Sequence, residues 1–243
     1  MRWLLISDIH ANLPALESVL KRASQIGYDR IMCAGDIVGY YPWANEVCDW
    51  VRENVDLCVM GNHDAIVAGL ISPEYFNGWA RTAILWTMEH LTETNKEFIK
   101  NLPLKLEFPE NNCLVHDTPV APMSMYYITD PYDAVEVFRK TDYRITVYGH
   151  THIPAAFVFN GAQVMGIKPK DLFPLRGDWR YLINPGSVGQ PRDGVPKASF
   201  AVWDTDEGVI YFERVEFDID AVVKKMKEVG LPLELAYRLY EGY

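Results

Sequence analysis

Three short apolar runs near the N-terminus each end directly in a polar cluster, and this pattern strongly constrains the fold. Residues 3–6 precede Ser7-Asp8-Ile9-His10, residues 30–34 precede Gly35-Asp36, and residues 55–60 precede Gly61-Asn62-His63-Asp64. Continuous apolar runs of this length are typical of strands buried on both faces. Apolar side chains recur at helical spacing in the two intervening segments, 13–23 and 43–51. The alternation predicts a parallel sheet, whose ligands gather at the carboxyl ends of its strands.

The remaining chain repeats the strand pattern and then changes character. Residues 113–115 run into His116, and residues 145–149 run into His150-Thr151-His152. The long segment 73–101 predicts a helix with Trp79, Ala83, Trp86 and His90 on its core-facing side, and the segment 118–131, rich in Pro, Met and Tyr, predicts a loop. Two hairpins are expected in the last third, 155–165 with a type I′ turn at Asn160-Gly161 and 199–212, followed by a helix from Asp218.

The chain therefore predicts one α/β domain over residues 1–243, parallel at its start and antiparallel at its end. Lys and Arg number 23 against 33 Asp and Glu, a net charge of −10, so a long nucleic acid would be repelled. The four cysteines form no Cys-x-x-Cys pair, which favours a reducing cytoplasm. We find no stretch of about eighteen apolar residues, so no membrane span is expected, and the N-terminal apolar run is too short for a signal peptide.

Histidine placement points to metal chemistry. Five of the six histidines directly follow an apolar run, and the sixth, His90, lies in the middle of a predicted helix. Imidazole and carboxylate together suit divalent Mn, Fe, Zn, Co or Ni, while the lack of cysteine ligands makes a structural zinc site a poor fit. Seven candidate ligands exceed what one tetrahedral ion uses, and two ions that share a carboxylate fit the number.

In order along the chain, these motifs resemble the calcineurin-like metallophosphoesterase superfamily. The resemblance spans residues 8 to 152, and the turn Asn184-Pro185-Gly186-Ser187 is similar to that of the small bacterial and archaeal phosphodiesterase-like branch. It implies a four-layer α/β/β/α sandwich, in which two mixed β-sheets are flanked by helices.

The resemblance also implies a role for each motif residue. Asp8, His10 and His152 would hold a first divalent ion, Asn62, His116 and His150 a second, and Asp36 would bridge the two. Manganese is the first candidate, with Fe, Zn, Ni or Co as others. A hydroxide bridging both ions would attack phosphorus in line. His63 would act as general acid at the leaving group, oriented by Asp64.

Departures from the superfamily pattern bear on the substrate. Asp117 stands where many members have glycine. No arginine follows Gly35-Asp36 within the next five residues, and Asp64 replaces the glutamate of protein phosphatases, which argues against a phosphoprotein. Two divalent ions would outweigh the charges of Asp8 and Asp36, so the net charge does not exclude a small phosphorylated substrate.

Three residues outside the motifs are candidate substrate contacts. They are Asn12, Tyr126 in the 118–131 loop beside Tyr127, and Arg192 after the Asn184 turn. Each also has a plain structural interpretation: a helix cap for Asn12, surface packing for the tyrosines, and a solvated turn for Arg192.

Three functions remain open from the sequence. The first is metal-dependent hydrolysis of a small phosphodiester or nucleotide. The second is hydrolysis of a dinucleoside polyphosphate such as diadenosine tetraphosphate, the same chemistry at an anhydride. The third is a non-catalytic protein-binding scaffold, as in a retromer subunit of similar fold. A scaffold needs neither His63 nor the whole ligand set, so an enzyme is favoured. The oligomeric state stays open.

Overall fold

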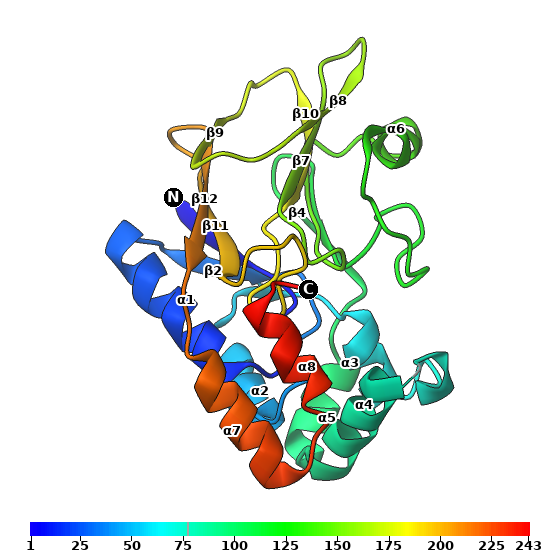
Figure 1. The fold of residues 1–243 in the computed structure, drawn as a ribbon. Helices are drawn as coiled ribbons and strands as arrows, with labels where there is room; N and C mark the ends of the chain where they lie inside the picture. Colours follow the sequence, from blue (N-terminus) through cyan, green and yellow to red (C-terminus); the bar gives the residue numbers. More distant parts are fainter. Residues whose placement is uncertain (77) are drawn as a thin grey trace.

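Two six-stranded mixed sheets form the centre of the molecule in the computed structural model, which describes residues 1–76 and 78–243 (Figure 1). The first sheet has the order β3-β2-β1-β11-β12-β9, made of β1 (Arg2–Ile6), β2 (Arg30–Cys33), β3 (Leu57–Cys58), β9 (Leu172–Pro174), β11 (Ala198–Asp204) and β12 (Val209–Val215). The second has the order β4-β5-β6-β10-β7-β8, made of β4 (Lys105–Phe108), β5 (Asn112–Val115), β6 (Ile145–Val147), β7 (Ala155–Phe159), β8 (Val164–Ile167) and β10 (Arg180–Asn184).

As predicted, the first strands of the chain pair parallel and the last ones pair antiparallel. β1, β2 and β3 are parallel neighbours, and so are β5, β6 and β10. The hairpin β11–β12 pairs antiparallel, and β11 lies against β1 in the same sheet. The α/β class with two mixed sheets is therefore confirmed.

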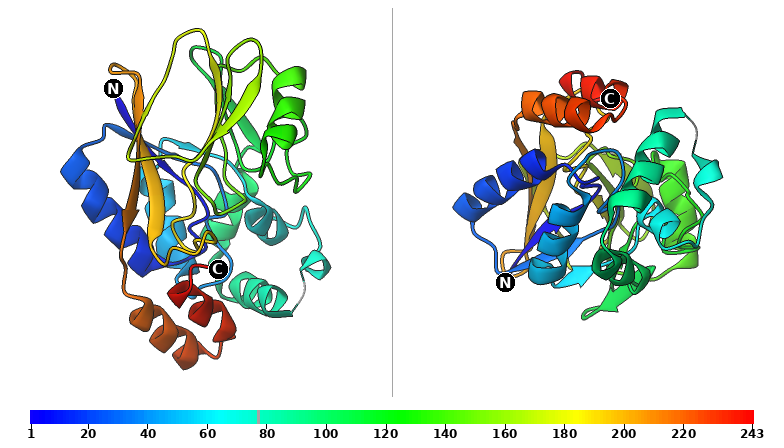
Figure 2. Two further views of the ribbon diagram at one scale, coloured as in Figure 1. Left: turned by 45° about the horizontal axis from the view of Figure 1, so that its top comes forward. Right: turned by 90° about the horizontal axis from the view of Figure 1, so that it is seen from below.

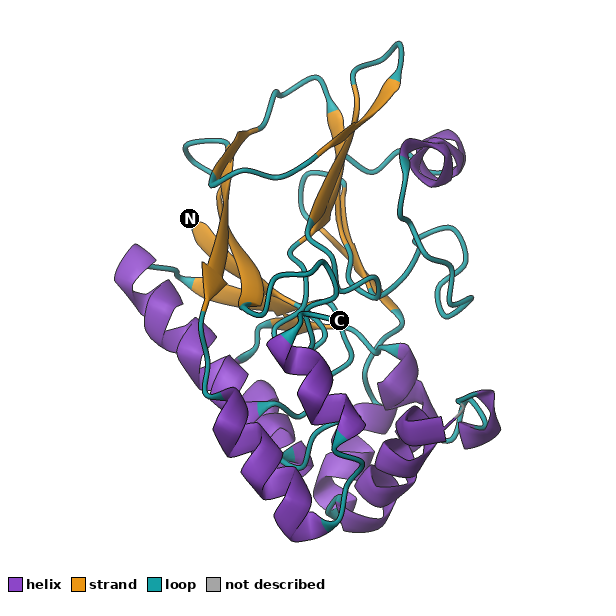
Figure 3. Cartoon of the chain, in the orientation of Figure 1, coloured by secondary structure: helices purple, strands orange, loops and turns teal. Residues whose placement is uncertain are grey.

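Eight α-helices lie within the described residues, most of them at one end of the sheets (Figure 3). They are α1 (Leu13–Ile26), α2 (Ala44–Asn54), α3 (Asn62–Val67), α4 (Gly78–His90), α5 (Glu93–Lys100), α6 (Pro131–Lys140), α7 (Ile219–Val229) and α8 (Glu234–Tyr237). Two 3-10 turns, η1 (Pro73–Tyr75) and η2 (Arg238–Tyr240), complete the set. None of the helices in the described parts of the chain is both long and apolar enough to cross a bilayer.

The alternating side chains of β1 show how the layers pack. Leu4 and Ile6 face α1 and α2 on the outer side of the first sheet, whereas Trp3 and Leu5 face the second sheet. On the far side of the second sheet, α6 packs Val137 and Phe138 onto its strands, and the views in Figures 1 and 2 agree on this order. β1 is thus buried on both faces, which is why its sequence is continuously apolar.

The prediction of one long helix over 73–101 was wrong. The segment is divided into η1, α4 and α5, because Thr92 caps a new helix by accepting a hydrogen bond from the Asn95 amide. Its buried side carries Ala83, Ile84 and Thr87, while Trp79 is half exposed and His90 lies exposed against Trp86. Asn77 lies outside the described residues.

The two predicted hairpins are confirmed, but the type I′ turn was wrong. Four residues, 160–163, separate β7 from β8, and of Asn160 and Gly161 only the glycine has a positive φ. The Asn160 side chain instead accepts hydrogen bonds from the amides of Ala162 and Gln163, which builds a wider loop. Helix α6 and strands β4, β9 and β10 were not predicted.

Candidate metal centre

All nine polar residues predicted at the strand ends meet at one place in the fold. Asp8 and His10 follow β1, Asp36 follows β2, Asn62 to Asp64 open α3, His116 follows β5, and His150 and His152 follow β6. Each of these side chains is buried, with an exposed fraction of 6% or less. Burial of so many ionisable groups costs free energy unless they are paired or bind a metal.

The backbone at this site is held in an unusual conformation. Asp8, His10, Asp36, His150 and His152 all have left-handed φ values, between 51° and 66°. Such a conformation costs an ordinary residue about 1–3 kcal/mol, and it persists where the surrounding structure enforces it. Here the Asp8 amide donates to the Gly35 carbonyl and the His10 amide to that of Asp36. The loops after β1 and β2 thus brace one another and turn their side chains toward the same point.

Four of the residues form a compact set of possible metal ligands. Asp8, His10, Asp36 and His152 each offer an atom within 4.8 Å of those of the other three. The Nε2 atoms of His10 and His152 lie 3.1 Å apart, and Nε2 of His152 lies 3.4 Å from an Asp8 carboxylate oxygen. Nitrogen and oxygen donors at these separations suit a divalent transition metal ion.

The hydrogen bonds of His10 and His152 test whether a cation fits between them. Nδ1 of His10 lies 3.2 Å from the Val38 carbonyl and Nδ1 of His152 lies 2.6 Å from that of Gln190, so both Nδ1 atoms carry the proton. Burial lowers the pKa of both rings well below the usual range, so both are neutral near pH 7. Two unshared electron pairs then face each other across 3.1 Å. This arrangement repels by itself and fits a cation bound between the rings.

Asp36 lies between this set and a second group of candidate ligands. Its Oδ2 is 3.6 Å from Nε2 of His10 and 3.5 Å from Nε2 of His116, while its Oδ1 accepts a hydrogen bond from the His63 amide. Although burial lowers the pKa of His116, the Asp36 carboxylate raises it to about 10, so a second ion would compete with a proton for that nitrogen. The geometry fits a carboxylate that bridges two ions.

The second group is completed by Asn62 and His150. Asn62 Oδ1 lies 3.0 Å from Nε2 of His116. Nε2 of His150 is buried, and no hydrogen-bond partner for it exists among the described residues. A buried imidazole nitrogen without a partner costs free energy, and coordination of a metal would satisfy it.

His63 lies beside the candidate ligands rather than among them. Its ring packs between Tyr40 and Phe76, with centroid distances of 4.6 and 4.3 Å, and its buried Nδ1 has no partner within the described chain. Burial lowers the pKa of His63 to about 4, so the free ring is neutral at pH 7. Gly39 lies against the ring, since a Cβ atom at this position would overlap with Nδ1 of His63.

Among the described residues no hydrogen bond joins Asp64 to the His63 ring, so the structure does not show the predicted direct orientation. Its carboxylate accepts hydrogen bonds from the backbone amides of Ile37, Val38 and Gly61 at 2.9–3.2 Å. These amides belong to the loops after β2 and β3. Asp64 therefore joins the two loops that carry Asp36 and Asn62, and it acts on the site through the backbone.

We predict that Gly39→Ala lowers the free energy of unfolding by more than the conformational cost alone. Gly39 has φ of 116°, and a methyl group there would displace His63. Gly161→Ala is the matched control, since φ is 89° and no atom of the described residues lies within 4 Å of where the methyl group would be. The control should lose about 1–3 kcal/mol, and chemical denaturation should show a larger loss for Gly39→Ala. Equal losses would show that the ring tolerates the methyl group.

The Asn184 turn fastens the histidine loop after β6 to the loop after β1. The Asn184 side-chain amide donates to the Gly149 carbonyl at 2.7 Å and to Thr151 Oγ1 at 3.0 Å. The Ser187 hydroxyl donates to the Asp8 carbonyl at 2.9 Å. The turn thus stabilises the position of two loops that carry candidate ligands, Asp8 on one and His150 on the other, more than 140 residues apart in sequence.

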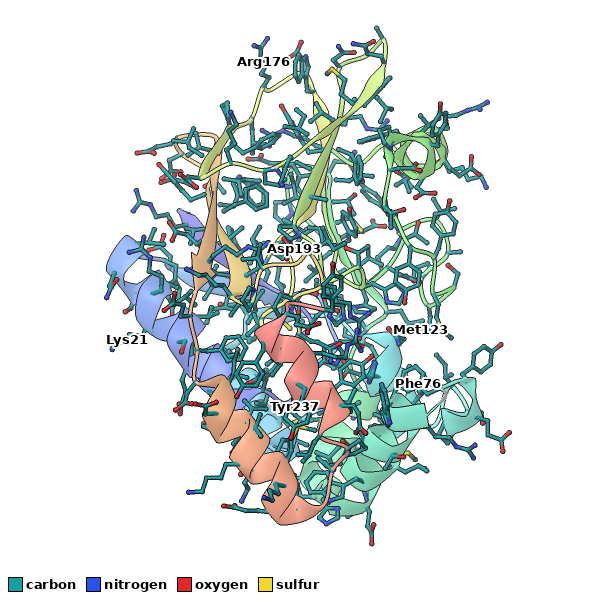
Figure 4. The ribbon with its side chains drawn as sticks, in the orientation of Figure 1. Lys21, Phe76, Met123, Arg176, Asp193 and Tyr237 are labelled. Atoms are coloured by element: carbon teal, nitrogen blue, oxygen red, sulfur yellow. The ribbon has the colours of Figure 1, made fainter. Side chains whose placement is uncertain are left out.

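A pocket of about 210 Å³ opens directly onto the candidate ligands. Its wall includes Tyr40, Phe76, Tyr127 and Arg192 beside His63. Figure 4 labels Phe76 ahead of α4 and Met123 on the loop that precedes α6. A larger pocket of about 610 Å³ opens elsewhere, between β7, β8 and β12, and none of the nine polar residues lines it.

The candidate substrate contacts are placed differently from one another. Tyr127 stacks on His150 with a centroid distance of 4.1 Å, whereas the Tyr126 hydroxyl donates to Asp133 away from the pocket. Asn12 is buried as the cap of α1, and its amide donates to the Gly189 carbonyl. Arg192 lies at the pocket, where it contacts Gln190 and the Tyr40 hydroxyl.

Sequence reasoning missed Gly39, Tyr40 and Phe76. The first two lie three and four residues after Asp36, and this closeness to a ligand was the available signal. Phe76 lies between η1 and α4, and the sequence around it gives no indication that it packs against His63.

Asp117 organises the loop that carries Tyr127. Its buried carboxylate accepts hydrogen bonds from the amides of Thr118, Met123 and Met125 at 2.7–3.1 Å. Both methionines have positive φ, so these bonds hold an otherwise unfavourable loop conformation.

We expect Asp117→Asn to loosen this loop. An asparagine would turn an N–H donor toward one of the amides, and a mismatch of this kind costs about 1–3 kcal/mol. Amide hydrogen exchange should accelerate at Met123 and Met125. Asp171→Asn, an exposed position, is the control and should leave both rates unchanged. Unaltered exchange in Asp117→Asn would contradict the role of this carboxylate.

Comparison with known proteins agrees with this geometry. The profile of the calcineurin-like phosphoesterase superfamily domain matches residues 1–208. The chain belongs to the calcineurin-like phosphoesterase superfamily. A phosphoesterase of this superfamily acts on a phosphorylated substrate, and the buried Asp/His cluster is consistent with metal binding.

Three relatives are similar over nearly the whole phosphoesterase chain. An uncharacterised protein of Methanocaldococcus jannaschii is 40% identical over 98% of this chain and 97% of its own. The crystal structure of a metallophosphoesterase from Sphaerobacter thermophilus is 38% identical, with a TM-score of 0.88 over 100% of this chain and 99% of that one. A hypothetical protein of Pyrococcus horikoshii shares the fold at 21% identity, with a TM-score of 0.81 over 100% and 98% of the two chains.

Proposed function

We propose that this protein is a dinuclear metal-dependent phosphoesterase that hydrolyses a small phosphodiester or nucleotide. The observation that carries the proposal is the position of Asp36 Oδ2, 3.6 Å from His10 and 3.5 Å from His116. One carboxylate oxygen at comparable distances from two imidazoles is suited to a pair of ions that share it. We also propose a cytoplasmic location, which the four free thiols support.

Asp8, His10 and His152 would hold the first ion, and Asn62, His116 and His150 the second, with Asp36 shared. Manganese is the first candidate. When bound, such a pair supplies Lewis acidity and makes a water nucleophile available near neutral pH.

The protein's own residues would orient the substrate and move a proton. Tyr127 and Arg192 border the pocket at the ligands, so the leaving group would lie among them and His63. His63 is neutral in the free protein because burial lowers its pKa to about 4. A phosphoester anion beside the ring favours the protonated form, which can then donate to the leaving oxygen.

A turnover panel with Mn²⁺ tests the proposal. The panel compares a phosphomonoester, a phosphodiester, a cyclic nucleotide and diadenosine tetraphosphate, with His90→Ala as a control histidine outside the site. We expect turnover of the diester or nucleotide and none after chelation. Preference for diadenosine tetraphosphate would support the anhydride alternative. Bound metal without turnover on any of the four would contradict the proposal and favour a scaffold.

A further inference from the structure

A second pocket adjoins the one at the metal ligands. It has a volume of about 430 Å³ and shares Tyr40, Ala80 and Arg192 with the smaller pocket. Arg238, Trp79 and Leu235 line its other side. A substrate bound at the ligands could therefore extend past Arg192 into this space.

The lining of the second pocket is positively charged in an otherwise acidic protein. It includes Arg192 and Arg238 and, among the described residues, no Asp or Glu. Neither arginine has an Asp or Glu oxygen within 4.0 Å in the described chain, although the net charge is −10. For comparison, Arg214 on β12 is paired with Asp193, the neighbour of Arg192.

Contacts between residues distant in sequence fix the two segments that carry the arginines. The Tyr41 hydroxyl donates to the Leu235 carbonyl on α8, and the Gln190 amide donates to the Tyr41 hydroxyl, both at 3.0 Å. Arg192 itself donates to Gln190 Oε1 and lies over the Tyr40 ring. Arg238 directly follows Tyr237, which Figure 4 labels on α8. The C-terminal segment, which carries Arg238, and the loop of Gln190, which carries Arg192, are therefore both attached to Tyr41 beside the pocket.

We propose that Arg192 and Arg238 bind a second phosphate group of the substrate, so that the substrate is a phosphoester carrying a phosphate besides the one at the metal ligands. This inference rests on the proposed phosphoesterase function and narrows its substrate class. Two guanidinium groups at one pocket repel each other, and a phosphate relieves the repulsion by accepting hydrogen bonds from both. Burial, and next the charge of Arg192, lower the pKa of Arg238, which is consistent with their closeness. Tyr40 and Trp79 add aromatic faces beside this anion site.

A pair of matched substrates tests the inference. Thymidylyl-(3′→5′)-thymidine carries one phosphate, and its 3′-phosphorylated derivative carries a second one on the nucleoside that leaves through its 5′ oxygen, while the reacting diester is the same. The wild type should show a higher kcat/KM for the derivative. In Arg238→Gln this preference should fall by about tenfold or more, because a hydrogen bond to a charged group is lost. Arg238→Lys should retain part of the preference. Arg139→Gln, an exposed position on α6, is the matched control and should retain all of it.

Each outcome decides one claim. A wild type with no preference, or an Arg238→Gln variant that keeps the preference, would overturn the second-phosphate site. Hydrolysis of neither substrate would count against the proposed function, and calorimetry would then test the site directly. Thymidine 3′,5′-bisphosphate should bind more tightly than thymidine 5′-phosphate, and Arg238→Gln should remove the difference; equal affinities would overturn the inference. With diadenosine tetraphosphate as the substrate, a decrease of kcat/KM in Arg238→Gln would place the second phosphate in a polyphosphate chain rather than on the sugar.

Discussion

Asp36→Asn is expected to abolish turnover and to lower the metal content of the purified protein. The variant keeps an oxygen that can accept from the His63 amide, so α3 stays attached. It loses the negative charge that lies between His10 and His116. A metal pair stabilises the transition state by several kcal/mol, so its loss corresponds to a decrease on the order of 10³-fold or more in rate.

Metal analysis and steady-state kinetics on the same samples measure this effect. Asp171→Asn removes an exposed carboxylate and serves as the matched control, with unchanged metal content and rate. Circular dichroism checks that both variants are folded. An Asp36→Asn protein with full metal content and wild-type turnover would show that the Asp36 carboxylate does not bridge two metal ions.

His63→Ala is expected to keep its metals and lose most of its turnover on esters with poor leaving groups. The ring lies outside the ligand set, so its removal does not open the coordination sites. General acid catalysis contributes about 10²–10⁴-fold, and this is the expected decrease for an alkyl ester. For a p-nitrophenyl ester the decrease should be much smaller, because this leaving group departs without a proton.

The dependence on the leaving group separates an acid from a structural residue. His63→Gln fills more of the space between Tyr40 and Phe76 and distinguishes lost chemistry from a cavity. His90→Ala, on the exposed side of α4, should leave every rate unchanged. Wild-type turnover of an alkyl ester by His63→Ala would exclude this histidine as the acid.

Much of the fold was predictable because its signals are local. Continuous apolar runs identified β1, β2, β5 and β6, and helical spacing identified α1 and α2. The failure over residues 73–101 has a local cause as well, because periodicity does not show where a cap such as Thr92 restarts a helix. Strands β4 and β9 are short and lie at sheet edges. A weak apolar pattern is enough for an edge strand to form, so the sequence did not indicate these two.

The roles of individual acidic residues were less predictable. Asp64 directly follows His63 and Asp117 directly follows the proposed ligand His116, and these positions suggested contact with His63 or substrate. In the structure both carboxylates accept hydrogen bonds from backbone amides of neighbouring loops. A carboxylate serves equally well as a ligand, a base or an amide acceptor, so its role depends on what the fold places beside it.

The sequence by itself determined that the polar residues would meet. The carboxyl ends of parallel strands lie at one edge of a sheet, so residues that directly follow such strands are brought together wherever they fall in the chain. Tertiary structure alone decided how they meet. The left-handed backbone of five proposed ligands, the Nδ1 contacts that direct Nε2 of His10 and His152 toward each other, and the position of Arg238 beside Arg192 all depend on packing between distant segments. Local periodicity carries no information about such contacts, because they form only when the two sheets and the C-terminal helices pack.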